Sequence, residues 1–557
     1  MIRREIKSLI EKSIKELQKE GKLPDFEMPE IKVERPEEST HGDYSTNVAM
    51  VTSKLVKKNP MEIAENIKSQ TSNLKSGFFE KIEVAIPGFI NFFISKEYLQ
   101  GQVKEILKQK EKFGKLETDR GKSVNVEFVS ANPTGPLHLG HGRGAFWGDV
   151  LSNILEKAGY KVTREYFIND YGKQILLLGK SIDARYREIL GEQAEISEDF
   201  YKGEYVKEIA NEIIEESKDK YLKISENDRV KTFTEIGFKK MLKEARELLD
   251  KIGVRYDVWF SERRLYEKGL VKKAVELLKK KGFTYEKEGA LWFSSTKFGD
   301  DKDRVLIKAD NEPTYFASDI AYHIDKVSRK YDLMINGWGA DHWGYKARLM
   351  AAAQVLGFEQ KLKIVVGQFV RLVEKGMEVK MSKRGGIFVT LKELIEEVGP
   401  DVSRFFFLMK SVDTHIDFDL DLAKEQSEKN PVYYIQYAHA RICSILKKVK
   451  TPRSRCFASL RGRQISKLLI HPSELELIKQ LIRLPEIIED IAKDYQVQRI
   501  PQYAIDLATA FHQFYRDCQV IIGDIPLSEA RLALVLATKI VLKNTLDLMG
   551  ISVPEKM

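Results

Sequence analysis

Residues 124–169 read VNVEFVSANPTGPLHLGHGRGAFWGDVLSNILEKAGYKVTREYFIN, and their pattern changes twice along the way. From Val124 to Phe128 apolar and polar residues alternate, which predicts a strand. From Phe146 onward apolar residues recur at helical spacing until Gly159, which is placed to end a helix, and a second extended apolar run follows. The stretch therefore predicts a strand–helix–strand unit of a parallel sheet.

The turn between this strand and this helix contains His138-Leu139-Gly140-His141. A helix N-terminus presents free amides and partial positive charge, so phosphate is a natural ligand there. A pair of metal-binding histidines, or histidines that merely cap the helix, would suit the same residues. The turn alone leaves these three interpretations open.

Length and composition place the chain among multidomain globular proteins. Its 557 residues suggest three or four domains, and 43% hydrophobic with 31% charged residues is ordinary for that class. No run approaches the roughly 20 apolar residues that span a bilayer. Residues 1–20 are interrupted by charges and predict an amphipathic helix, not a signal peptide.

The cysteines indicate a reducing environment. Only three occur, Cys443, Cys456 and Cys518, and their spacing fits neither a zinc site nor a disulfide framework. A cytoplasmic location is therefore expected.

Positive charge is concentrated near the C-terminus. The net charge is +9, and residues 431–557 contribute 18 Lys/Arg − 12 Asp/Glu = +6. Within that region, Arg441 to Lys467 contains nine basic residues and no acidic one. Such a run is either a solvated basic loop or a surface that binds a polyanion.

Residues 1–117 are predicted to form a separate N-terminal α+β domain. A helix is expected after His41-Gly42-Asp43, and residues 82–94 read as strands broken at Pro87-Gly88. Four side chains could contact an unpaired base or could equally be core and turn residues: Tyr44, Asn47, Phe89 and Asn91.

Residues 118–390 read as a doubly wound α/β domain with a helical insertion at about 174–290. Amphipathic, densely charged runs without a catalytic cluster fill the insertion. Four short apolar runs are predicted to extend the parallel sheet, at residues 290–293, 304–307, 332–335 and 363–366.

A second motif, VKMSKRGG at residues 379–386, follows a predicted hairpin. It could be merely a basic turn. Together with the histidine turn, however, the motif indicates an ATP site, because both motifs are suited to binding the phosphates of ATP.

The two motifs resemble the HIGH and KMSKS signatures of class I aminoacyl-tRNA synthetases. Longer segments are similar to arginyl-tRNA synthetases in particular and cover nearly the whole chain: EFVSANPTGPLHLGHGR, FINDYGKQ, YDVWFSE, GADHWGY, MSKRGG and NPVYYIQYAHAR. The resemblance implies a Rossmann-like catalytic domain, an N-terminal tRNA-binding domain and a C-terminal α-helical anticodon-binding domain.

The resemblance also implies the reaction that the protein catalyses. The carboxylate of L-arginine attacks the α-phosphorus of ATP, supplied with Mg2+, and the adenylate then acylates the 3′-terminal ribose of tRNA(Arg). This chemistry needs positioning and charge stabilisation but no protein-held metal. By resemblance, the catalytic residues are His138, His141, Lys380 and Lys383, and further ATP-binding residues are Gly140, Asp341, Met381 and Ser382.

Recognition of arginine calls for carboxylates and an aromatic wall, because a guanidinium is a planar cation with five donors. Tyr315 and Asp319 lie four residues apart, on one side of a predicted helix turn. By resemblance, the arginine pocket contains Glu127, Asn132, Tyr315, Asp319 and Tyr345. Spacing alone would equally allow each to be a structural polar residue.

Residues 431–557 predict an α-helical bundle, and by resemblance it binds the anticodon. The preceding segment, residues 391–430, contains Arg404 and would link the bundle to the catalytic domain. Aromatic residues that could stack on bases, or simply pack, are Tyr434, Tyr437 and Tyr515.

Three alternatives fit the sequence less well. A small nucleotidylyltransferase would share the histidine turn but not the second motif, the length or the basic bundle. A cysteinyl-tRNA synthetase needs cysteine-bound zinc, and no cysteine precedes residue 443. A catalytically dead tRNA-binding paralogue is disfavoured because both motifs are intact. The chain is expected to be a cytoplasmic monomer without membrane association.

Overall fold

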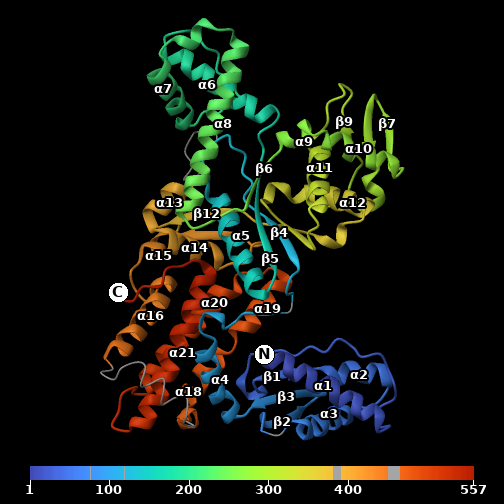
Figure 1. The fold of residues 1–557 in the computed structure, drawn as a ribbon, viewed down its shortest axis with the longest axis vertical. Coiled ribbons are helices and arrows are strands. Elements are labelled where there is room, and N and C mark those ends of the chain that lie inside the picture. Colours follow the sequence, from blue (N-terminus) through green and yellow to red (C-terminus); the bar gives the residue numbers. More distant parts are fainter. Residues whose placement is uncertain (76, 118, 380–389, 449–464) are drawn as a thin grey trace.

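The computed structural model describes residues 1–75, 77–117, 119–379, 390–448 and 465–557. At its centre lies a parallel five-stranded sheet with the order β11-β10-β4-β5-β6 (Figure 1). Its strands are β4 (Ser123–Glu127), β5 (Lys161–Ile168), β6 (Val258–Ser261), β10 (Leu333–Trp338) and β11 (Leu362–Val366). The predicted Rossmann-like α/β fold is confirmed.

The predicted strand–helix–strand unit is β4, α5 (Leu139–Ala158) and β5, and Gly159 ends the helix with a φ of 108°. Helix and sheet approach closely, because a Cβ on Gly148 would lie only 2.1 Å from Cγ of Phe128. Glycine is therefore required at this crossing.

Two of the four strands predicted to extend the parallel sheet do not belong to it, so that prediction was wrong. β8 (Ala290–Phe293) and β9 (Arg304–Ile307) form an antiparallel sheet with β7 (Thr284–Lys287). This sheet packs with α10 (Leu270–Lys280) and α11 (Tyr315–Ser328) around a separate core. A short apolar run is compatible with either kind of sheet, which is why the sequence pattern could not separate them.

The predicted helical insertion contains α6 (Lys173–Ile189), α7 (Glu204–Ser217) and α8 (Glu226–Lys251), which share a core of their own at the top of Figure 1. The insertion is not helical as far as residue 290. β6 lies within that range and forms the edge of the central sheet beside β5.

The N-terminal α+β domain has a three-stranded antiparallel sheet of order β1-β3-β2. Its strands are β1 (Tyr44–Thr46), β2 (Phe79–Ala85) and β3 (Phe89–Ile94), and its helices are α1 (Ile2–Lys19), α2 (Val48–Val56) and α3 (Pro60–Leu74). α4 (Lys96–Gln109) then leads out of it and packs against the C-terminal helices.

The C-terminal bundle consists of α16 (Pro431–Lys448), α18 (Pro472–Leu481), α19 (Leu484–Asp494), α20 (Arg499–Asp517) and α21 (Ile525–Met549). Ahead of it lie β12 (Val370–Glu374), α13 (Leu391–Val398), α14 (Pro400–Leu408) and β14 (Ile416–Asp419).

Arg404 of α14 joins three other parts of the molecule. Arg404 is 1% exposed, and its guanidinium donates to the Asp149 carboxylate of α5, to the Met549 carbonyl oxygen at 2.9 Å and to the Ile252 carbonyl oxygen at 2.8 Å. Through Arg404, residues 391–430 thus contact both α5 and the end of the last long helix of the chain.

Candidate active site and nucleic-acid-binding surfaces

The two signature histidines form one stacked pair at the start of α5, with ring centroids 3.6 Å apart. The Gly140 amide donates to Nδ1 of His138 at 3.1 Å, and the His138 amide donates to Nδ1 of His141 at 3.2 Å. Both Nδ1 atoms therefore accept, so each neutral ring has its proton on Nε2. The backbone thus sets both the tautomer and the orientation of each imidazole.

The second signature, with Lys380, Met381, Ser382 and Lys383, lies outside the described residues. Its downstream flank is nevertheless fixed at the first signature. Thr390 forms an antiparallel bridge with His138, and the Leu391 amide donates to the Leu137 carbonyl oxygen at 2.8 Å.

Asp341 lies in a short 3-10 helix, Ala340–Tyr345, just after β10, and its side chain is exposed. Because β10 and β4 are parallel neighbours, Asp341 and the histidine turn follow the carboxyl ends of adjacent strands. Ligands of doubly wound sheets bind at this edge.

Asp319 and Glu262 form an acidic cluster beside the sheet. Burial raises the pKa of Asp319 to about 7, against the opposing effect of the neighbouring Tyr345 hydroxyl. Glu262 is 2% exposed and accepts a hydrogen bond from Ser318 Oγ at 2.9 Å. Burial raises its pKa to about 7 as well, in spite of that bond, and Asp319 adds to the rise. A bound cation would stabilise the ionised form of both carboxylates.

Glu262 was missed from the sequence, although a signal existed. It directly follows β6, at the same carboxyl edge of the sheet as the histidine turn. That position becomes informative only once residues 258–261 are known to be a strand of the central sheet and not part of a helical insertion.

The other predicted arginine-pocket residues have different surroundings. Glu127 is buried and accepts a hydrogen bond from the fully buried Lys326 ammonium at 2.6 Å, so its charge is already balanced. Asn132 is exposed and donates to Gln174 Oε1 at 2.7 Å. Tyr315 begins α11 one turn before Asp319 and is 50% exposed.

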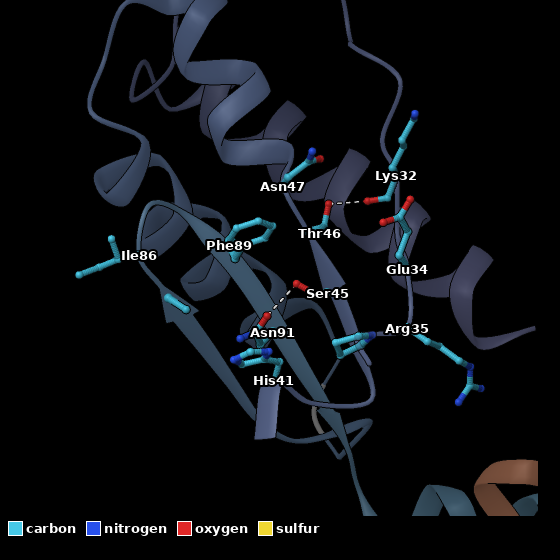
Figure 2. Close-up of a pocket in the computed structure, with 12 residues that line it drawn as sticks. Lys32, Glu34, Arg35, His41, Ser45, Thr46, Asn47, Ile86, Phe89 and Asn91 are labelled. Carbon is cyan, nitrogen blue, oxygen red and sulfur yellow. Dashed lines mark hydrogen bonds between the residues drawn. The ribbon is translucent and has the colours of Figure 1, made fainter. Parts of the chain in front are cut away.

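Asn47, Phe89 and Asn91 line a pocket of about 410 Å³ in the N-terminal domain (Figure 2). The Phe89 ring is 40% exposed, and Asn91 Oδ1 accepts a hydrogen bond from Ser45 Oγ at 2.7 Å. An exposed ring beside amide groups is suited to an unpaired base.

Tyr44 does not share this pocket, so the prediction that it is available to a base was wrong. It is 1% exposed, and its hydroxyl donates to Glu486 Oε1 of α19 at 2.7 Å. Because Glu486 lies 442 residues away in the chain, the local sequence gave no sign of this partner.

In the bundle, Tyr437 and Tyr515 are each 37% exposed, and the Arg441 guanidinium lies 4.9 Å and 5.0 Å from their ring centroids. Tyr434 packs against the His512 ring at 4.8 Å. Of the basic stretch, residues 449–464 lie outside the described residues.

Neither a metal site nor a membrane-spanning helix occurs among the described residues. No group of three or more His, Cys, Asp or Glu side chains there could hold a metal ion. None of the described helices combines the length and apolar character needed to cross a bilayer.

Comparison with known families gives matches to all three regions. The family described as tRNA synthetases class I (R), catalytic domain, matches residues 102–407. The arginyl tRNA synthetase N terminal domain matches residues 4–94, and the DALR anticodon binding domain matches residues 435–557.

Relatives that match over the whole chain support the same family. The chain is 47% identical to the arginine–tRNA ligase of Caldanaerobacter subterraneus subsp. tengcongensis, covering 99% of this chain and 98% of that protein. It is 46% identical to the Bacillus subtilis (strain 168) arginine–tRNA ligase, covering 100% of both. The structure of Thermus thermophilus arginyl-tRNA synthetase, 23% identical, has the same fold with a TM-score of 0.79 over 100% of both chains. With its catalytic-domain match and this full-length identity, the chain belongs to the arginyl-tRNA synthetase family of class I.

Proposed function

We propose that this protein activates L-arginine with ATP and Mg2+ and transfers the arginyl group to the 3′-terminal ribose of tRNA(Arg). The observation that carries the amino-acid assignment is the Asp319 and Glu262 cluster, where burial holds both carboxylates near pKa 7. A guanidinium stays charged at all relevant pH values and can donate hydrogen bonds to two carboxylates at once.

In the activation step, the arginine carboxylate oxygen attacks the α-phosphorus of ATP and pyrophosphate leaves. His138 and His141, with N–H groups on Nε2, donate to phosphoryl oxygens as negative charge develops there. Lys380 and Lys383 hold the leaving pyrophosphate, and Met381 and Ser382 also contribute to ATP binding. Gly140 leaves room for ATP, and Asp341 accepts hydrogen bonds from its ribose hydroxyls.

In the amino-acid pocket, Asp319 and Glu262 bind the guanidinium, and Tyr315 and Tyr345 supply aromatic walls. Asn132 binds the α-substituents of arginine. Glu127, paired with Lys326, contributes to the pocket through its charge near Asp319. This arrangement selects arginine over neutral side chains, because an uncharged analogue would leave buried carboxylates without a partner.

Two surfaces bind the tRNA body. An unpaired base enters the N-terminal pocket against Phe89, with Asn47 and Asn91 as hydrogen-bonding partners. Anticodon nucleotides stack on Tyr437 with Arg441 as cation, while Tyr434 supports this surface from beneath. We also infer a cytoplasmic monomer, consistent with free, buried thiols at Cys443 and Cys518.

ATP–pyrophosphate exchange with each amino acid in turn, with and without tRNA, tests this function. We expect exchange with arginine when tRNA(Arg) is present and little with other amino acids. Tight tRNA binding without exchange for any amino acid would instead identify a catalytically dead tRNA-binding protein.

A further inference from the structure

Helix α19 has two chemically different sides. Leu484, Ile488 and Ile491 are buried on one side. On the other side, Glu489 and Asp490 follow Glu486 by three and four residues, and the three form a row of carboxylates. The helix can therefore contact two different partners at once.

The carboxylate side contacts the N-terminal domain. Arg3 donates to Asp490 Oδ1 and to Glu489 Oε2, each at 2.7 Å. Arg35 Nε donates to Glu486 Oε2 at 2.9 Å, and the Tyr44 hydroxyl donates to Oε1 of the same carboxylate. We call this set of contacts the α19 joint; two further pairs extend it, Arg4 with Glu489 and Lys479 with Asp43.

Two carboxylates of the α19 joint are shielded from water. Glu486 is 4% and Glu489 is 8% exposed. Burial opposes ionisation of Glu489, but hydrogen bonds from Arg3 and Arg4 outweigh it and lower its pKa to about 2. Buried charge pairs are screened little by salt, and each partner tolerates few alternative positions for the other.

The same element reaches both functional regions. Arg35 belongs to the segment that lines the N-terminal pocket, and Figure 2 shows its side chain pointing away from that pocket. Just past the far end of α19, the Tyr495 carbonyl oxygen accepts a hydrogen bond from Trp147 Nε1 of α5 at 3.3 Å. α19 thus lies between the pocket and the helix that begins at the signature histidines (Figure 1).

We propose that Glu486 and Glu489 are positioning residues for aminoacylation: through Arg35, Arg3 and Arg4 they hold the N-terminal pocket at one set distance from the catalytic helix. A tRNA whose body occupies that pocket then has its 3′ end delivered to the adenylate. The inference rests on the proposed function, because it takes the pocket to be a tRNA site.

The test measures KM separately for tRNA, arginine and ATP in aminoacylation. We expect Glu486→Gln and Arg35→Met each to raise the KM for tRNA about tenfold or more, since each breaks a buried charged hydrogen bond. The KM values for arginine and ATP should stay within twofold. The double variant should be no worse than the poorer single variant, because the two side chains share one interaction.

Tyr44→Phe provides a milder second variant, which removes one hydroxyl and should raise the KM for tRNA a few-fold. Glu65→Gln is the matched control, since its pair with Lys68 lies on the exposed surface of the same domain. An unchanged KM for tRNA in both Glu486→Gln and Tyr44→Phe overturns the proposal, and so does an equal rise for all three substrates. If the unaltered protein attaches no arginine to tRNA, the proposed function fails and this inference falls with it.

Discussion

His138 and His141 hold each other in place through backbone amides and a stacked contact. Donors fixed in this way stabilise transition-state charge without reorganising. We expect His141→Ala to slow adenylate formation by about 100- to 1,000-fold, with little change in the KM for arginine. Pyrophosphate exchange in the presence of tRNA measures this, and a near-normal rate would contradict the assignment.

The pH dependence of arginine binding should follow Asp319 and Glu262. Their pKa values of about 7 mean that both are largely protonated at pH 6 and ionised at pH 8. Because the guanidinium needs ionised partners, the KM for arginine should rise as pH falls from 8 to 6, by up to about tenfold for each carboxylate. Asp319→Asn should raise the KM throughout this range and weaken its pH dependence. A KM for ATP that changes equally would argue against the role.

The same two carboxylates should affect the stability of the unliganded protein with the opposite pH dependence, stabilising it more at low pH than at high pH. A carboxylate whose folded-state pKa lies above its unfolded value contributes stability at low pH that is lost as pH rises through about 7. Arginine binding restores it, so the rise in melting temperature caused by added arginine should be larger at pH 8 than at pH 6. Thermal unfolding at both pH values, with lysine as the control ligand, measures the difference.

At the scale of elements, the crossing of α5 over β4 depends on Gly148. A Cβ there would overlap the Phe128 ring, so Gly148→Ala should lower the free energy of unfolding by about 1–3 kcal/mol. Gly144→Ala in the same helix is the matched control, since the nearest atom to its Cβ would be 3.8 Å away. Chemical denaturation should show a loss for the first variant alone; equal losses in both variants would mean that the contact with Phe128 is not the cause.

The elements also show what sequence patterns can predict. The β4–α5–β5 unit was predictable because its alternation, helical spacing and terminal glycine all lie within one short stretch. The placement of β8 and β9 was not, because sheet membership depends on partners that lie elsewhere in the chain. β6 was hidden for the same reason, and with it the position of Glu262.

At the scale of the whole molecule, Arg404 joins four segments through one buried guanidinium. Arg404→Met should leave the Asp149 carboxylate buried without a partner and cost about 3–5 kcal/mol of stability. Arg371→Met, which breaks the exposed pair with Asp417, serves as the control and should leave the melting temperature unchanged. Calorimetry that shows equal effects for both would mean that water reaches Asp149.

Long-range contacts also decide which predicted site residues are accessible. The signature histidines could be located from the sequence because their neighbours in the chain determine their geometry. Tyr44 and Asn91 could not be told apart, since only the folded chain brings Glu486 over the tyrosine hydroxyl while Asn91 stays at the pocket.

The α19 joint has a consequence for evolution and for engineering. Because Arg35 and Glu486 form a shielded ion pair, we expect a change of charge at one position to be accompanied across homologous chains by a compensating change at the other. A chimera that takes residues 1–117 from a distant relative should therefore work only when α19 is transplanted from the same parent.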